Sequence, residues 1–301
     1  MKFIFFGYRL RHWLEVAALF LYVGICLLLG LKIASALWGF VARTIGPYLG
    51  ISRRIRRNVA RAMPDISAEE CAAIEKSVWD NAGRATAEII HLKRLANNDK
   101  YFTITGTEHI QAAIDKGKGV VFMSGHFANW EMLPKAAQTF EIECNITYRQ
   151  ANNPLVDRWL TNQRHSAWGH TFSPKGQNAA KTMIRFLKVG KSVATLVDQK
   201  ENQGIEAKFF DLPAMTTPAP AQLALRYGVP VILATITREP NPDNPESLFH
   251  IHSRPLQPPP ATGNTQQDIA LMTQSINDFL EAHIRKRPGE WLWLHNRWSD
   301  D

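Results

Sequence analysis

Cysteine is scarce in this sequence. The three cysteines among 301 residues, Cys26, Cys71 and Cys144, are too few and too far apart for a disulfide framework or a zinc site, and they favour a reducing compartment. Internal repeats and low-complexity tracts are also missing, which excludes a collagen-like chain. With 45% hydrophobic and 21% charged residues, the chain can bury a core, so a disordered tail and a multi-span transporter are excluded as well.

Negative charge is almost absent from the N-terminal part of the chain. Residues 1–61 contain ten lysines and arginines and one acidic residue, Glu15, so this segment carries +9. Because the whole chain carries +8, the remaining 240 residues sum to −1. The positive charge therefore belongs to an N-terminal arm, which favours a membrane surface over a nucleic-acid partner.

The same arm contains the longest apolar run. Residues 16–31 carry no charge, and residues 13–31 form a run of nineteen interrupted only by Glu15. A helix of this length spans about 28 Å, close to the ~30 Å of bilayer hydrocarbon. We therefore predict a membrane anchor within residues 1–63, and the arginines at 53–57 favour a body (residues 64–301) on the cytoplasmic side of an inner membrane. A cleaved signal peptide, with Ala34-Ser35-Ala36 as its site, and a buried core helix are the alternatives.

A second basic segment follows the apolar run. Ile51, Ile55, Val59 and Met63 recur every four residues with arginines between them, which predicts a helix with one apolar stripe. Two interpretations are equally open. In the first, the stripe contacts anionic lipid; in the second, it packs on the body and leaves the arginines in solvent.

The body alternates between apolar strands and amphipathic helices. This alternation predicts an α/β fold with a largely parallel central sheet covered by helices on both faces. Strands are expected near 101–105, 119–124, 144–149, 192–197, 231–237 and 248–252, and helices near 67–96, 108–116, 127–140, 154–168, 178–189, 220–227 and 268–287.

Common cofactor and nucleophile motifs are not satisfied. Gly190-Lys191-Ser192 lacks the earlier glycine of a phosphate-binding loop, and no G-x-S-x-G elbow is present. His250 and His252 have the spacing of metal ligands on a strand, but alternating polar positions explain them more simply. We expect no metal, nucleotide or other cofactor.

One constellation can support catalysis. The apolar strand ending at Ser124 is followed by Gly125, His126 and, after four intervening residues, Glu131. Ligand sites in open α/β sheets lie beyond the carboxyl ends of strands. If 127–140 is helical, Glu131 lies one turn on and can accept the Nδ1 proton, which leaves Nε2 of His126 as a base for a substrate hydroxyl. The alternative is a capping histidine with a solvent-facing glutamate.

Several segments together resemble a known family. The segments are HFANWE at 126–131, YRQANNPL at 148–155, Arg164, Asp198-Gln199, Phe209-Phe210 with Thr216-Thr217, and PGEWLWLHNRW at 288–298. With an N-terminal anchor, they resemble the late acyltransferases of lipid A biosynthesis (the lauroyl/myristoyl acyltransferases) over essentially the whole chain. Asn296 departs from the family, which has arginine there.

The resemblance implies a function and a set of roles. It implies acyl transfer from acyl carrier protein to a hydroxyl of a lipid A precursor, with His126 as base and Glu131 orienting the ring. Arg149 would bind a sugar phosphate, and Arg164 or backbone amides near Phe127 would hold the oxyanion. Asp198 and Gln199 would contact substrate or an arginine, and Cys144 would pack in the core. Another glycolipid or phospholipid acceptor, a hydrolase and a non-catalytic membrane-tethered lipid-binding module remain as alternatives.

Overall fold

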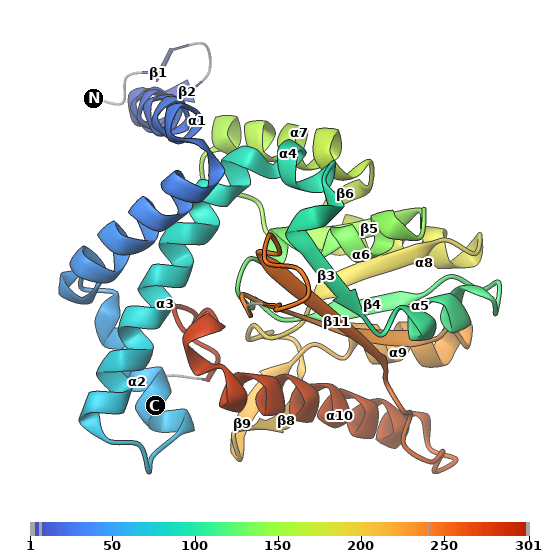
Figure 1. Cartoon of the computed structure of the whole chain (residues 1–301). Coiled ribbons are helices and arrows are strands. Elements are labelled where there is room, and N and C mark those ends of the chain that lie inside the picture. The colour runs from blue at the N-terminus through green and yellow to red at the C-terminus, as the bar shows by residue number, and fades with distance from the viewer. Residues whose placement is uncertain (1–3, 6–7, 240, 299–301) are drawn as a thin grey trace.

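A seven-stranded sheet lies at the centre of the computed structural model, which describes residues 4–5, 8–239 and 241–298. The strand order is β3-β11-β10-β4-β7-β5-β6 (Figure 1). β10 and β11 pair antiparallel, and the other five pairs in this sheet are parallel. The predicted, largely parallel α/β fold is therefore confirmed. The strands are β3 (Phe102–Thr105), β4 (Val121–Ser124), β5 (Cys144–Tyr148), β6 (Thr171–Pro174), β7 (Ser192–Leu196), β10 (Val231–Thr237) and β11 (Phe249–Pro255).

Helices flank this sheet (Figure 1). The helix α3 begins with a capping box, in which the side chains of Ser67 and Glu70 each bind the other residue's backbone N–H. The helices after the anchor region are α3 (Ala68–Glu88), α4 (Leu92–Ala96), α5 (Thr107–Ile114), α6 (Pro134–Thr139), α7 (Pro154–Trp168), α8 (Gln177–Lys188), α9 (Ala219–Tyr227) and α10 (Thr265–Lys286).

The central strands are buried because their sequences are apolar on both faces. All four residues of β4 and all seven of β10 are buried. Gly119, just before β4, has a φ of +71°, and a Cβ there would lie 2.4 Å from the carbonyl oxygen of Lys191. A glycine is therefore required where β4 comes alongside β7. The carboxyl ends of β4, β7 and β5 consequently lie together at one edge.

Three features differ from the sequence prediction. Strand β6 and the hairpin of β8 (Ile205–Phe209) and β9 (Leu212–Thr216) were not expected. The helix predicted over 127–140 is wrong, because only a short 3₁₀ turn (Trp130–Met132) and α6 are helical there. Ala128 has a left-handed φ of 40°, and its N–H donates to the carbonyl oxygen of Glu290 at 2.7 Å. That long-range contact holds the segment out of a helix.

The N-terminal helix α1 (Leu10–Ile45) presents an apolar outer face. It bends at Gly30, where φ is 71°, and it runs along α3 (Figure 1). Its inner face is polar in places: Ser35 donates to Glu88 at 2.7 Å. Large apolar side chains on the other face are exposed, among them Leu14, Phe20, Leu21, Leu28, Ile33, Leu37 and Phe40. Within the described part of the chain, this is the one helix long and apolar enough to span a membrane, and the alternative of a buried core helix is wrong.

The basic helix α2 (Ser52–Ala62) docks on the body. Ile55 and Val59 are fully buried in the main core, so this part of the apolar stripe is not available to lipid. Arg56 donates to Glu75 on α3 at 2.7 Å. Of the two interpretations, packing on the body is therefore the one that applies to Ile55 and Val59. The helix ends at Ala62.

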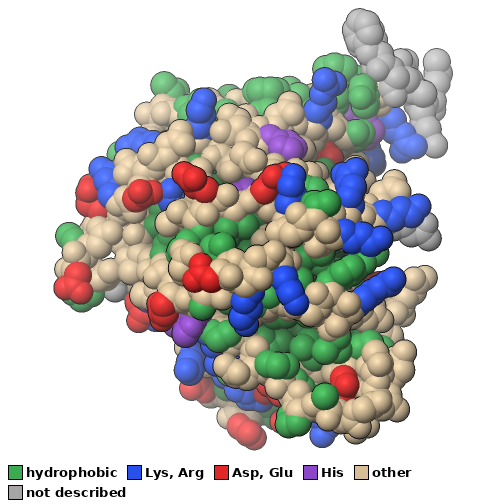
Figure 2. Space-filling view, turned by 90° about the vertical axis from the view of Figure 1, so that its right-hand side faces the viewer, with side chains coloured by type: hydrophobic (Ala, Val, Ile, Leu, Met, Phe, Trp, Pro, Cys, Tyr) green, Lys and Arg blue, Asp and Glu red, His purple; other side chains and the backbone are tan. Residues whose placement is uncertain are grey.

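On the body, unlike on the N-terminal arm, positive and negative charges are mixed. On the face turned away from α1, Figure 2 shows basic and acidic side chains interspersed around hydrophobic side chains that lie in a hollow. This pattern agrees with a sum of about −1 over residues 62–301. The excess positive charge is concentrated near α1 and α2 in the sequence.

We expect the exposed face of α1 to bind the membrane. Leu21 is 68% and Leu28 89% exposed, so lysine at both positions should leave the fold intact. A lysine in hydrocarbon costs about 3 kcal/mol. The double variant should therefore move from the membrane fraction to the soluble fraction in sedimentation. Lysines at Val189 and Leu271, which are also exposed, serve as the control. Full membrane retention of the α1 variant would contradict the anchor.

Candidate active site

His126 lies just beyond the carboxyl end of β4, at the edge where three parallel strands end. Gly125 precedes it, and a Cβ at Gly125 would lie 2.8 Å from the Phe127 ring and 3.2 Å from Oδ2 of Asp198. The absence of a side chain at this position allows Asp198, which follows the neighbouring strand β7, to approach the backbone. The Ser124-Gly125-His126 sequence is therefore built to bring an imidazole and a carboxylate together.

Asp198 holds the imidazole. Its Oδ1 lies 2.7 Å from Nδ1 of His126, and its Oδ2 accepts the His126 backbone N–H at 2.8 Å and the Trp291 Nε1–H at 2.7 Å. Burial by itself would raise the pKa of Asp198, but the imidazole and these donors hold the pKa of this carboxyl well below its usual value. Asp198 is thus an ionised, buried acceptor, and it fixes the Nδ1–H tautomer of His126.

The other ring nitrogen of His126 faces an amide. Gln199 Nε2 lies 3.2 Å from Nε2 of His126 and 2.9 Å from Nε2 of His295. Burial and the neighbouring His126 lower the pKa of His295 to about 4, so His295 is neutral near pH 7. The amide NH₂ of Gln199 can therefore donate one N–H to each of these two ring nitrogens. This leaves Nε2 of His126 as the acceptor, which is the position of a general base.

An apolar cavity opens beside this nitrogen. Its volume is about 400 Å³, and its lining includes His126, Trp130, Gln199 and His295. The rest of the lining is mainly apolar and includes Met123, Ala136, Ala137, Cys144, Ile146, Leu160, Phe172 and Leu292. Burial raises the pKa of the Cys144 thiol well above its usual value, so Cys144 lines the cavity as a neutral group. The cavity suits an apolar ligand with a reacting end at His126.

Glu131 is engaged elsewhere. Arg164 donates to both of its carboxylate oxygens, from Nε at 2.8 Å and from Nη2 at 2.5 Å. The expectation that Glu131 orients His126 is therefore corrected, and Asp198 does so. The physical reason is the non-helical segment after Phe127, which removes the helical turn on which that expectation rested. Of the backbone amides near Phe127, those of Phe127 and Ala128 donate to the carbonyl oxygens of Gly125 and Glu290.

Comparison with known families decides the class of the protein. The model of the bacterial lipid A biosynthesis acyltransferases matches residues 6–300. The chain belongs to this family. The expected resemblance is thereby confirmed, and the protein is an acyltransferase.

Curated relatives of this acyltransferase divide between two acceptors. A phosphatidylinositol mannoside acyltransferase of Mycobacterium tuberculosis is 24% identical over 275 residues, which is 87% of this chain and 80% of the relative. The lipid A biosynthesis lauroyltransferase of Escherichia coli is 23% identical over 256 residues, which is 81% of this chain and 78% of the relative. The E. coli palmitoleoyltransferase is 24% identical over 250 residues, with 81% and 77% covered. Family membership therefore fixes acyl transfer but not the acceptor.

The acyltransferase brings the six predicted site residues together at one edge of its sheet. His126, Glu131, Arg149, Arg164 and Gln199 all line the cavity, and Asp198 lies behind His126. Arg149 is exposed and makes no ion pair with any residue that the structure describes. Among the described residues, no group of three or more His, Cys, Asp or Glu side chains is placed to hold a metal ion.

Two site residues of the acyltransferase were missed as functional groups. Trp291 binds Asp198, and His295 binds Gln199. Both lie in the segment 288–298, which was noted as part of the resemblance without a role for its side chains. The only signal in the sequence was that both residues belong to a segment that resembles the family. The position of His295 beside His126 depends on a contact across some 170 residues of sequence, which spacing alone does not reveal.

Proposed function

We propose that this acyltransferase moves a fatty acyl chain from acyl carrier protein to a hydroxyl of a lipid A precursor, at the cytoplasmic face of the inner membrane. The observation that carries the proposal is His126, with Nδ1 bound to the buried Asp198 and the ring lining an apolar cavity. The E. coli relatives, named for lipid A biosynthesis, support this acceptor. The exposed apolar face of α1 supports a membrane location.

The chemistry follows from the tautomer of His126. The acceptor hydroxyl replaces the Gln199 amide as the group bound to Nε2 of His126. Nε2 then takes the proton of this hydroxyl while the hydroxyl oxygen forms a bond to the carbonyl carbon of the thioester. Asp198 stabilises the imidazolium that forms. The tetrahedral oxyanion then collapses, the carbon–sulfur bond breaks, and the imidazolium returns the proton to the leaving thiolate. The transfer needs no acyl-enzyme, and the neutral thiol of Cys144 takes no part in it.

Arg164 is the proposed oxyanion donor. Glu131 binds its Nε and Nη2, while its Nη1 makes no hydrogen bond with the described residues. Burial by itself would lower the pKa of Arg164, but Glu131 raises it above its usual value, so the guanidinium stays charged. The role proposed for Glu131 is thus to fix the planar guanidinium beside the reacting carbon.

Replacing Arg149 and replacing Arg164 with lysine should have different effects on the kinetics. Lysine at 164 keeps the charge but loses the two-pronged contact with Glu131, and we expect kcat to fall tenfold or more. Lysine at 149 retains an exposed cation at the cavity mouth. It should mainly raise KM for a phosphorylated acceptor, because a bidentate phosphate contact is lost. Steady-state kinetics separate the two effects, and unchanged kinetics in both variants would remove these arginines from the site.

A second acceptor is favoured by one finding. The M. tuberculosis relative is named for phosphatidylinositol mannoside and covers as much of this chain as the E. coli enzymes do. Its acceptor is also a glycolipid, so the same base and cavity would serve. The second candidate function is therefore acyl transfer to a phosphatidylinositol mannoside.

The test uses the purified full chain with acyl-acyl carrier protein or acyl-coenzyme A as donor. Lipid A precursor and phosphatidylinositol mannoside are supplied in parallel, and products are identified by mass spectrometry. We expect one added acyl chain on the lipid A precursor, with the acyl-acyl carrier protein as the better donor. Acylation of the mannoside alone would establish the second candidate. Free fatty acid without an acylated acceptor would indicate a hydrolase, and binding without any product would indicate a lipid-binding module.

A further inference from the structure

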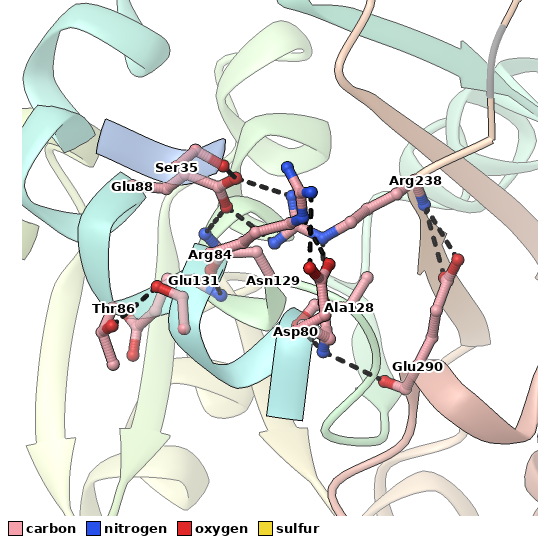
Figure 3. Close-up of polar contacts among 12 residues, drawn as sticks. Ser35, Asp80, Arg84, Thr86, Glu88, Ala128, Asn129, Glu131, Arg238 and Glu290 are labelled. Carbon is pink, nitrogen blue, oxygen red and sulfur yellow. Dashed lines mark hydrogen bonds and ion pairs between the residues drawn. The ribbon is translucent and has the colours of Figure 1, made fainter. Parts of the chain in front are cut away.

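A buried ion pair lies directly behind the active-site segment. Glu88, at the end of α3, is 2% exposed, and its carboxylate accepts hydrogen bonds from four donors. Arg238 donates from Nη1 at 2.6 Å and from Nη2 at 2.7 Å, Ser35 Oγ donates at 2.7 Å, and Asn129 Nδ2 donates at 2.8 Å. Figure 3 shows Ser35, Asn129 and Arg238 converging on Glu88 from three different elements.

Stability alone does not explain this pair. Removing two charges from water costs several kcal/mol for each ion, and apolar residues of similar volume are often equally stabilising. A carboxylate with four donors in the interior therefore fixes geometry more than it adds net stability. Its value lies in what the donors hold in place.

Two amides connect the pair to the segment after His126. Asn129 donates to Glu88, and its own Oδ1 accepts the Glu131 backbone N–H at 3.3 Å. Asn81 accepts from Nε of Arg238 at 2.8 Å and donates to the carbonyl oxygen of Ala128 at 2.9 Å. Through Asn129 and Asn81, the ion pair is thus connected to residues 128–131.

That segment needs external support. Ala128 has a left-handed φ of 40°, a conformation that costs a non-glycine residue of order 1 kcal/mol or more and persists only where the surroundings impose it. The segment begins two residues after His126 and ends at Glu131, which binds Arg164. Its backbone position consequently sets the distance between the base and the proposed oxyanion donor.

We propose that Glu88 and Arg238 are positioning residues for catalysis: the pair holds residues 128–131, and thereby the Glu131–Arg164 pair, in register with His126. Because Ser35 of α1 donates to Glu88, the position of α1 on α3 also contributes to the geometry of the site. The catalytic part of this inference rests on the proposed acyl transfer.

The decisive substitution is Glu88→Gln. All four partners of the carboxylate are donors, so the amide NH₂ of a glutamine must face at least one of them. We expect kcat to fall at least tenfold with little change in KM, because a misplacement of about 1 Å can cost up to 10²-fold in rate. Arg238→Lys should have a similar effect, since one ammonium cannot replace three guanidinium contacts. This second variant covers the case in which Glu88→Gln does not fold.

Glu75→Gln is the matched control. Glu75 is also buried, also lies on α3 and also pairs with an arginine, Arg56, but it lies far from His126 in the hydrogen-bond network. It should lower the melting temperature without lowering kcat at a temperature where both proteins are folded. Equal losses of kcat in the Glu75 and Glu88 variants would overturn the positioning role.

A matched pair of variants tests whether the contact between α1 and Glu88 contributes to catalysis. Ser35→Ala removes the α1 donor to Glu88, whereas Thr86→Val removes a hydroxyl contact between Tyr22 and Thr86 that also joins α1 to α3 but does not touch Glu88. We expect Ser35→Ala to lower kcat several-fold and Thr86→Val to leave it unchanged. The same kcat in both variants would show that α1 does not help to position residues 128–131.

Amide hydrogen exchange separates the two proposals. In the folded variants Glu88→Gln should raise the exchange rate of the amides of Ala128 and Glu131 at least tenfold, and Glu75→Gln should not. If the wild-type protein acylates no acceptor, the proposed function fails. Faster exchange at these amides in Glu88→Gln would still establish that the Glu88–Arg238 pair holds residues 128–131 in place. Unchanged exchange and unchanged kcat in Glu88→Gln would overturn the positioning role in an active enzyme.

Discussion

Replacing His126 with alanine is expected to lower kcat by about 10² to 10⁴, with KM for the acceptor changed little. The reason is that a general base contributes this much to rate, while the groups that bind substrate stay in place. The variant should fold, stay on the membrane and bind lipid.

The control is a histidine outside the site. His109 pairs with Glu108 on the surface of the body, and His109→Ala should retain wild-type turnover. Expression and membrane content are matched by immunoblot, and glycolipids from cells carrying each variant are compared by mass spectrometry. A folded His126→Ala protein that restores full glycolipid acylation would defeat the proposed mechanism.

The sheet and the position of His126 at its edge were predictable from local sequence. Short apolar runs such as VFMS before Gly125 are typical of buried strands, and strands alternating with amphipathic helices favour a parallel sheet. The carboxyl end of such a strand is the ordinary place for a ligand, which made His126 a candidate before its neighbours were known. Asp198 was a candidate only through the resemblance to the family, in the Asp198-Gln199 segment.

The pairing of these residues was not predictable from spacing. Glu131 is the nearer carboxylate in sequence, and a helix would have brought it beside His126. The left-handed Ala128, bonded to Glu290, prevents that helix. Asp198 is instead brought to the ring by the register of β4 with β7, in which Ser124 lies opposite Leu196. Strand order is a tertiary property, and it follows from no pattern within either segment.

The C-terminal segment and the hairpin illustrate the same limit. Arg297 is fully buried, donates to Met215 and Thr216 of β9, and lies 4.8 Å from the centre of the Phe209 ring. Burial lowers its pKa to about 10, so it remains charged near pH 7. The F-F…T-T stretch and the tryptophan-rich ending are therefore two halves of one packed unit. As separate motifs they carried the resemblance, but neither indicated the other as its partner.

The two carboxylates of the site should differ sharply in their amide variants. Asp198→Asn should lower kcat by about 10² to 10⁴, because an amide neither stabilises the imidazolium nor fixes the Nδ1–H tautomer. Glu131→Gln should cost about tenfold, because it loosens Arg164 while the imidazole stays in place. The measurement is kcat for each purified variant under saturating donor and acceptor.

Double variants show which carboxylate acts through the base. Once His126 is alanine, adding Asp198→Asn should lower the residual rate little further, because the two residues work as one unit. Adding Glu131→Gln to His126→Ala should still lower it about tenfold, because Glu131 acts on Arg164 and not on the ring. If Glu131→Gln instead has no further effect and Asp198→Asn does, Glu131 is the partner of His126 during turnover. The bond between Asp198 and the imidazole would then belong to a resting arrangement that substrate replaces.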